Sequence, residues 1–232
     1  MKAIILAAGF GTRLHPLTEN KAKPLLEIKG RPLLDYIVKK IPSDVEEIIL
    51  VSNGKFYDDF VKWNDNSEKK LKIINNGVFS NEERQGGISD LWLAISKLGI
   101  DDILVLHGDT LFDFSLEEFV NSFKEARNVS IGLHKMDFEE AKRFGVVEVS
   151  HGKIIGIEEK PKEPKSDLIM AGFYIIPKEK IVLIEDYLKT DKNKEGVTFL
   201  IQDWVGKEPI SPFVFEGVLE DIGTREVYER LK

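Results

Sequence analysis

Cysteine is absent from this sequence of 232 residues. The chain therefore has no disulfide bond, no thiol nucleophile and no cysteine-bound zinc. It also lacks an apolar run close to the length of a membrane span. Residues 1–4 lead straight into a strand-like segment, without the polar cleavage region of a secretory signal. These absences favour a cytoplasmic protein with no membrane partner.

Positive charge is not in excess either. The formal net charge is −7 and the sequence pI is about 5.3. This balance argues against a nucleic-acid partner, because nucleic-acid-binding proteins usually carry a basic face. Small anionic ligands stay open, since they need only a local cluster of donors.

Strand-like and helix-like segments alternate through the first half of the chain. Apolar strands are predicted at residues 2–8, 47–52, 71–75 and 102–107, and helices at 32–41, 55–63 and 88–98. Ser115 opens a further helix, with Glu118 at the spacing of a capping box. This order and the continuous apolar strands predict a parallel sheet with helices on both faces.

The regular alternation of strands and helices ends at about residue 128. Strands are predicted at residues 129–135, 146–150, 153–159, 168–176 and 211–216, and helices at 178–188, 197–205 and 225–231. His151 and Gly152 make a plausible two-residue hairpin turn, and residues 160–165 form a charged, proline-broken loop. With no repeat or linker, we expect one domain over 1–232, with an α/β half at about 1–128 and a mixed half at about 129–232.

The first strand runs into a glycine loop that carries cations. Gly9 and Gly11 are followed by Arg13 and Lys23, while Leu14 stands where a dinucleotide fingerprint needs its third glycine. The missing glycine argues against a nicotinamide-linked oxidoreductase. A guanidinium offers a planar fork of donors to phosphate oxygens, and glycine lets an anion approach the backbone closely. Together these residues favour phosphate binding over plain solvation.

Five segments, in order, resemble the signature of the sugar-1-phosphate nucleotidyltransferases, or nucleotide-sugar pyrophosphorylases. They are LAAGFGTRLHPLT with KAKPLL (6–18 and 21–26), HGD (107–109), EEKP (158–161), AGFYI (171–175) and EDIGT (220–224). The resemblance implies a Rossmann-like three-layer αβα fold with a mixed, mainly parallel central sheet. It also implies a transferase that uses Mg²⁺, an NTP and a sugar 1-phosphate to make an NDP-sugar and pyrophosphate.

The resemblance also implies roles for single residues. The nucleotide would be bound by Leu6, Ala8, Gly9, Gly11, Thr12, Arg13, Lys23, Gln85 and Gly87, and the sugar phosphate by Gly145, Glu159, Lys160, Ala171 and Gly172. Asp109 and Asp221 would hold the metal, since Mg²⁺ prefers hard oxygen ligands. Arg13, Lys23 and Asp109 would be catalytic by neutralising and aligning two anions. No histidine is a favoured acid or base.

Several alternatives stay open at this point. The base, and so UTP, dTTP, CTP or GTP, is not fixed, nor is the sugar or whether the chain forms a homo-oligomer. One rival is a cytidylyltransferase that acts on phosphocholine or another alcohol phosphate, although a choline pocket needs an aromatic cage. Another is a non-catalytic subunit that binds nucleotide sugars, which should have lost one of the charged site residues. We also expect a bare catalytic unit.

Overall fold

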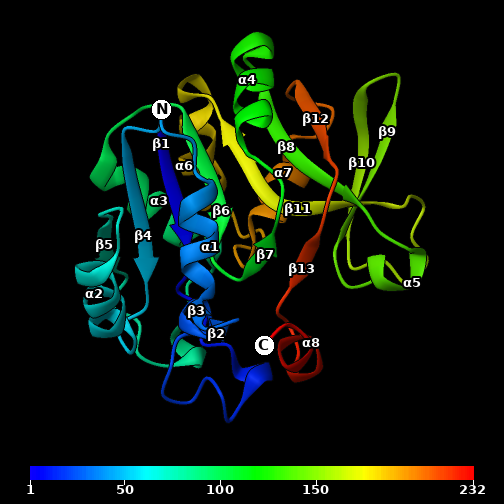
Figure 1. Cartoon of the computed structure of the whole chain (residues 1–232). Coiled ribbons are helices and arrows are strands. Elements are labelled where there is room, and N and C mark those ends of the chain that lie inside the picture. The colour runs from blue at the N-terminus through cyan, green and yellow to red at the C-terminus, as the bar shows by residue number, and fades with distance from the viewer.

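A nine-stranded mixed sheet runs through the molecule in the computed structural model, which describes residues 1–232 (Figure 1). Its strand order is β10-β9-β11-β6-β1-β4-β5, with β8 beside β11 and β12 beside β8. The strands are β1 (Lys2–Leu6), β4 (Glu47–Ser52), β5 (Lys72–Asn75), β6 (Ile103–His107), β8 (Val129–Lys135), β9 (Gly145–Ser150), β10 (Lys153–Glu159), β11 (Leu168–Ile176) and β12 (Ile210–Phe215).

The N-terminal strands β5, β4, β1 and β6 are all parallel. Their side chains alternate between two cores: Ala3 and Ile5 enter one, and Ile4 enters the other. Both faces of β1, β4 and β6 are buried, which is why these three strands are largely apolar, whereas the edge strand β5 has no fully buried residue.

Helices cover both faces of the sheet. The core of one face includes residues of α1 (Leu33–Lys40), α2 (Tyr57–Asn66), α4 (Glu117–Ala126), α5 (Phe138–Ala141) and α8 (Arg225–Leu231). The core of the other includes α3 (Gly87–Leu98), α6 (Ile181–Leu188) and α7 (Val197–Trp204). The predicted three-layer fold class is therefore confirmed. None of the helices has the length and apolar character needed to span a bilayer.

Antiparallel pairing dominates the C-terminal half of the sheet. Strand β11 runs antiparallel to β6, β8 and β9, and β9 and β10 form a hairpin. The predicted hairpin turn is confirmed, with φ of +49° at His151 and +72° at Gly152. In β11, the register with β8 shifts between Met170 and Tyr174, around a Gly172 with φ of +81°.

The structure differs from the sequence prediction at short elements. Two short antiparallel pairs were not predicted: the hairpin of β2 (Glu27–Ile28) with β3 (Arg31–Pro32), and the long-range pair of β7 (Thr110–Phe112) with β13 (Leu219–Asp221). The capping box was wrong, because α4 begins at Glu117 with Leu116 as its N-cap. The Ser115 hydroxyl instead accepts a hydrogen bond from the backbone of Glu117 at 3.1 Å.

The strand order places a crevice at one edge of the sheet. From β1 the chain moves outward to β4 and β5, and then returns to β6 on the other side of β1. The loops that follow β1 and β6 therefore part in opposite directions at the carboxyl ends of two adjacent strands. Open α/β sheets bind ligands at such a switch point.

Candidate active site

The loop after β1 is fixed by hydrogen bonds from buried side chains, while its backbone at Gly9 is open to a ligand. The buried Asn53 amide donates to the carbonyl of Ala8 at 3.0 Å, and the Thr18 hydroxyl donates to the carbonyl of Gly11 at 2.8 Å. Gly11 has φ of +63°, a conformation that favours glycine. A Cβ at Gly9 would meet no atom within 4 Å, so a ligand can approach the backbone there.

Arg13 lies just beyond this loop in a short 3₁₀ turn, Thr12–Leu14. Its side chain is exposed and has no ion-pair partner in the protein. Its positive charge opposes the raised pKa of Lys23 and adds to the lowered pKa of Asp109, so the guanidinium lies within electrostatic range of both groups. A free guanidinium in this place is available to an anionic ligand.

Lys23, Asp109 and Asp221 meet in one cluster. The Nζ atom of Lys23 lies 2.8 Å from Oδ2 of Asp109 and 3.4 Å from Oδ1 of Asp221. Lys23 is only 7% exposed, in a 3₁₀ turn that holds its backbone against the core. A buried ammonium requires partners of opposite charge, and the two aspartates supply them.

Two strands separated by more than a hundred residues bring the aspartates together. Asp109 follows β6, and the next residue, Thr110, begins β7. Strand β13 pairs with β7 so that Asp221 lies opposite Thr110. The backbone N–H of Ile222 also donates to the carbonyl of Asp109 at 3.3 Å. The short pair β7–β13, which sequence reasoning missed, is therefore what assembles the cluster.

The charges of the cluster support one another. Burial alone would lower the pKa of Lys23, but the carboxylates of Asp109 and Asp221 outweigh it and hold that pKa above its ordinary value. Burial would raise the pKa of Asp109, but Lys23, His107 and Arg13 bring it down to about 2. Asp109 is therefore ionised and Lys23 protonated at neutral pH.

The donor set of the cluster fits Mg²⁺. The carboxylates of Asp109 and Asp221 already converge on a cation, the ammonium of Lys23. Hard carboxylate oxygens suit this metal, which commonly takes one or two from the protein and the rest from phosphates and water. No third acidic or histidine side chain joins them to form a larger metal-binding group.

A cavity of about 200 Å³ lies beside the cluster, at the carboxyl edge of the sheet. It is lined by six of the predicted site residues: Leu6, Ala8, Gly9, Gln85, Gly87 and Asp109. Gly11, Thr12, Arg13, Lys23 and Asp221 do not line it; of these, Lys23 and Asp221 contact Asp109 or its ion-pair partner at one end. The structure thus gathers most of the predicted nucleotide-binding residues around one crevice.

Sequence reasoning missed eight of the residues that line this cavity. They are Asn76, Arg84, Gly86, Asp90, His107, Glu195, Gly196 and Val197. The segments before α3 and α7 dock there: the backbone N–H groups of Gly87 and Ile88 donate to the carbonyls of Glu195 and Lys194, at 3.0 and 3.1 Å. A Cβ at Gly86 would lie 2.1 Å from the Lys194 carbonyl oxygen. The glycine doublet was the one sequence signal of this close approach.

Three predicted sugar-phosphate residues lie together on the β9–β10 hairpin. Gly145 pairs with Glu159, and a Cβ at Gly145 would lie 3.1 Å from the Glu159 carboxylate and 2.9 Å from the Thr198 methyl. Lys160 follows with φ of +50° and an exposed ammonium 3.4 Å from Glu159. Thr198 follows Val197 of the cavity, so this group adjoins the crevice through the start of α7.

The two β11 residues of the prediction lie differently from each other. A Cβ at Gly172 would lie 3.0 Å from Nδ1 of His107, a residue of the cavity wall. Gly172 therefore allows β11 to approach the crevice. The methyl group of Ala171 instead packs in the hydrophobic core on the face covered by α1, α2, α4, α5 and α8.

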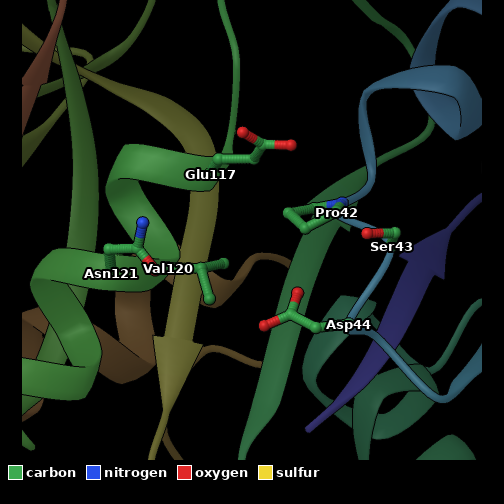
Figure 2. Close-up of a pocket in the computed structure, with 6 residues that line it drawn as sticks. All are labelled: Pro42, Ser43, Asp44, Glu117, Val120 and Asn121. Atoms are coloured by element: carbon green, nitrogen blue, oxygen red, sulfur yellow. The ribbon is translucent and has the colours of Figure 1, made fainter.

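A separate hollow of about 160 Å³ lies between α4 and the loop before β4 (Figure 2). The carboxylates of Asp44 and Glu117 line it, together with Pro42, Ser43, Val120 and Asn121. Its lining includes no cation, and Lys124 pairs with Asp44 at 2.5 Å. The negative lining makes it unsuitable for phosphate, and it contains none of the predicted site residues.

Known proteins resemble this chain over most of its length. It matches the family model "Nucleotidyl transferase" over residues 2–231. It is 33% identical to the bifunctional protein GlmU of Methanocaldococcus jannaschii, over 96% of this chain and 51% of that protein. It is 32% identical to the UTP–glucose-1-phosphate uridylyltransferase AglF of Haloferax volcanii, over 75% of this chain and 71% of AglF.

A solved structure agrees with these relatives. The crystal structure of a proposed glucose-1-phosphate thymidylyltransferase from Bacillus anthracis has a TM-score of 0.86 and 27% identity, over all of this chain and 93% of that one. The chain spans about half the length of the GlmU proteins it matches. The match over nearly every residue, with the charged cluster at the switch point of the sheet, shows that the chain belongs to the nucleotidyl transferase family.

Proposed function

We propose that this chain transfers a nucleotidyl group from an NTP to a sugar 1-phosphate, releasing pyrophosphate. The observation that carries the proposal is the cluster of Lys23, Asp109 and Asp221, with the unpaired guanidinium of Arg13 close by. It combines cations for phosphates with carboxylates for a metal, beside a cavity at the switch point. Relatives such as AglF, named as a glucose-1-phosphate uridylyltransferase, support the sugar phosphate.

The reaction needs charge neutralisation more than acid–base chemistry. An oxygen of the sugar phosphate, already ionised at neutral pH, forms a bond to the α-phosphorus. The bond from that phosphorus to the bridging oxygen breaks, and its electron pair leaves with pyrophosphate. Both reactants are anions, so the main obstacle is their repulsion, which fixed cations in a closed site reduce.

Each charged residue has a task in this proposal. Arg13 binds the β- and γ-phosphates and stabilises the leaving group, while Lys23 contacts the α-phosphate. Asp109 and Asp221 would hold Mg²⁺, which when bound supplies positive charge to the phosphate oxygens. Lys160 positions the attacking phosphate from the β9–β10 hairpin.

The uncharged side of the site suits a sugar. Glu159 would accept hydrogen bonds from sugar hydroxyls, and Gly145 and Gly172 allow the side chains of Glu159 and His107 to lie close to the backbone there. A quaternary ammonium such as choline is usually held by several aromatic faces. None of the five predicted sugar-phosphate residues is aromatic, so these residues favour the sugar. The nucleotide residues come from residues 1–128 and the sugar-phosphate residues from 129–232, as one catalytic unit would require.

The test is a panel of reactions with the wild-type chain. It is incubated with Mg²⁺, each common NTP, and either a sugar 1-phosphate or phosphocholine, and pyrophosphate is measured. The proposal expects release that depends on both the NTP and a sugar 1-phosphate. Release only with phosphocholine would support the alternative acceptor. Nucleotide binding with no release from any pair would point to a non-catalytic subunit and overturn the proposal.

A further inference from the structure

A polar pair, Asn76 and Asp90, lines the cavity on the side of strand β5. Asn76 directly follows β5, and Asp90 lies in the first turn of α3. Both line the cavity, and the Asn76 side-chain N–H donates to Oδ1 of Asp90 at 2.8 Å. Strand β5 lies three strands from β6, so about 14 Å of sheet edge separates this pair from Asp109. The pair is therefore at the distance where a nucleotide held by its phosphates would present its base.

The orientation of the Asn76 amide is fixed by a second contact. Its Oδ1 accepts a hydrogen bond from the backbone N–H of Val78 at 3.0 Å. The nitrogen must then be the atom that faces Asp90, and one of its two hydrogens is used there. The other Asn76 hydrogen and Oδ2 of Asp90 have no partner within the protein. The pair thus offers one donor beside one acceptor.

The carboxylate of Asp90 is not explained by packing alone. It forms no ion pair, and burial raises its pKa although the Asn76 hydrogen bond acts in the opposite direction. A partly desolvated charge with one neutral partner costs stability. Asp90 is also not one of the buried residues through which α3 packs on the sheet. A ligand that donates a hydrogen bond to Oδ2 would give this charge the partner it lacks.

We infer that Asn76 and Asp90 select nucleotides whose base presents a carbonyl beside a ring N–H. Uracil, thymine and guanine have this edge, with an acceptor for Asn76 and a donor for Asp90. In the same orientation, cytosine and adenine present the reverse, an amino group beside an unprotonated ring nitrogen, and would leave both protein groups facing like partners. The inference rests on the proposed function, because it assumes that the crevice holds an NTP.

The discrimination should be large for the wild-type chain. A site built to form hydrogen bonds rejects a ligand that leaves its polar groups unpaired far better than an apolar pocket rejects a size difference. Because Asn76 and Asp90 are only partly buried, we expect UTP, dTTP or GTP to exceed CTP and ATP by on the order of 100-fold in kcat/KM.

The experiment compares these five NTPs by calorimetric binding and by pyrophosphate release with sugar 1-phosphates. Wild type should bind at least one of UTP, dTTP and GTP about 100-fold more tightly than CTP and ATP. Asp90→Asn, which can turn an amide N–H toward the base, should reduce this ratio to below about tenfold. Asp58→Asn is the matched control, because Asp58 is an exposed aspartate in the first turn of another helix. It should leave the ratio unchanged.

The outcomes separate this inference from the function. Wild type that prefers CTP or ATP overturns the inference, whether or not a variant folds. An unchanged ratio in a folded Asp90→Asn variant overturns it too. Base-selective binding without pyrophosphate release would sustain the inference and contradict the proposed reaction, whereas a chain that binds no NTP would contradict both.

Discussion

The two ends of the crevice are built in different ways. At one end, Lys23, Asp109 and Asp221 form a charged cluster in which every member has an opposite charge as partner. At the other end, the carboxylate of Asp90 has one neutral partner, Asn76, and no cation. The first arrangement suits a reaction common to all nucleotides, since every NTP carries the same phosphates. The second suits a choice between bases, because one Asn76 hydrogen and Oδ2 of Asp90 have no partner within the protein.

Loss of charge at the phosphate end should give the largest effect. Asp109→Ala and Arg13→Ala should each lower pyrophosphate release by two to three orders of magnitude, or about 3–4 kcal/mol of transition-state stabilisation. Steady-state kinetics on purified variants measures this. Lys21→Ala is the matched control, because Lys21 lies in the same loop but pairs with Glu27 at 3.4 Å. Near-normal turnover in either site variant would remove the proposed role of that residue.

Substitution of two glycines should have different effects, one on stability and the other on nucleotide binding. Gly86 has φ of +89°, and a Cβ there would overlap the Lys194 carbonyl. Gly86→Ala should therefore lower the free energy of unfolding by about 2–4 kcal/mol. Gly9→Ala meets open space in the protein, so unfolding should not change while KM for the NTP rises. Urea unfolding measures the stability of both variants, and steady-state kinetics measures their KM for the NTP. The same pattern of changes in both variants would contradict the prediction.

Asp109 and Asp90 should affect the free energy of unfolding in opposite directions as the pH changes. The pKa of Asp109 is lowered to about 2, so its contribution to stability is complete above 3.8 and is lost as the pH falls toward 2. Asp109→Asn should cost about 1–2 kcal/mol at neutral pH, a value reduced for its 39% exposed side chain, and almost nothing near pH 2.

The pKa of Asp90 is raised by burial, so its charged form opposes folding at neutral pH. Asp90→Asn should accordingly increase stability slightly near pH 7, and this gain should disappear as the pH falls through the raised pKa. Urea unfolding between pH 2 and 8 measures both series. A loss of stability in Asp90→Asn at pH 7 would mean that this carboxylate is structural.

The end of the crevice with Lys23, Asp109 and Asp221 was largely predictable from the sequence, and the end with Asn76 and Asp90 was not. Glycines after a buried strand and a nearby arginine are local signals of anion binding, whereas the metal roles of Asp109 and Asp221 were implied by the resemblance to a known family. Pairing of β7 with β13 could not be predicted, because it joins two three-residue strands far apart in the chain. Asn76 and Asp90 are likewise brought together by tertiary packing across a 13-residue interval of loop and helix start. Only the predicted residues Gln85 and Gly87 indicated that the start of α3 borders the cavity.

Short elements account for the errors in the fold as well. Long apolar strands such as β4 were predicted with their observed bounds, since burial on both faces leaves a clear pattern. The capping box at Ser115 failed because the chain takes one more residue before α4 begins. A hydroxyl and a glutamate at the right spacing do not fix the backbone when the adjacent Leu116 is fully buried in the core.

The central claim is that Asp109 and Asp221 hold the metal that neutralises substrate phosphate. Titration of Mg²⁺ in the pyrophosphate-release reaction tests it most directly, with wild type and Asp221→Asn compared at saturating NTP and sugar 1-phosphate. We expect the variant to need at least about tenfold more Mg²⁺ for half-maximal release, because it lacks one of two anionic ligands. The same Mg²⁺ dependence in both proteins would contradict the claim.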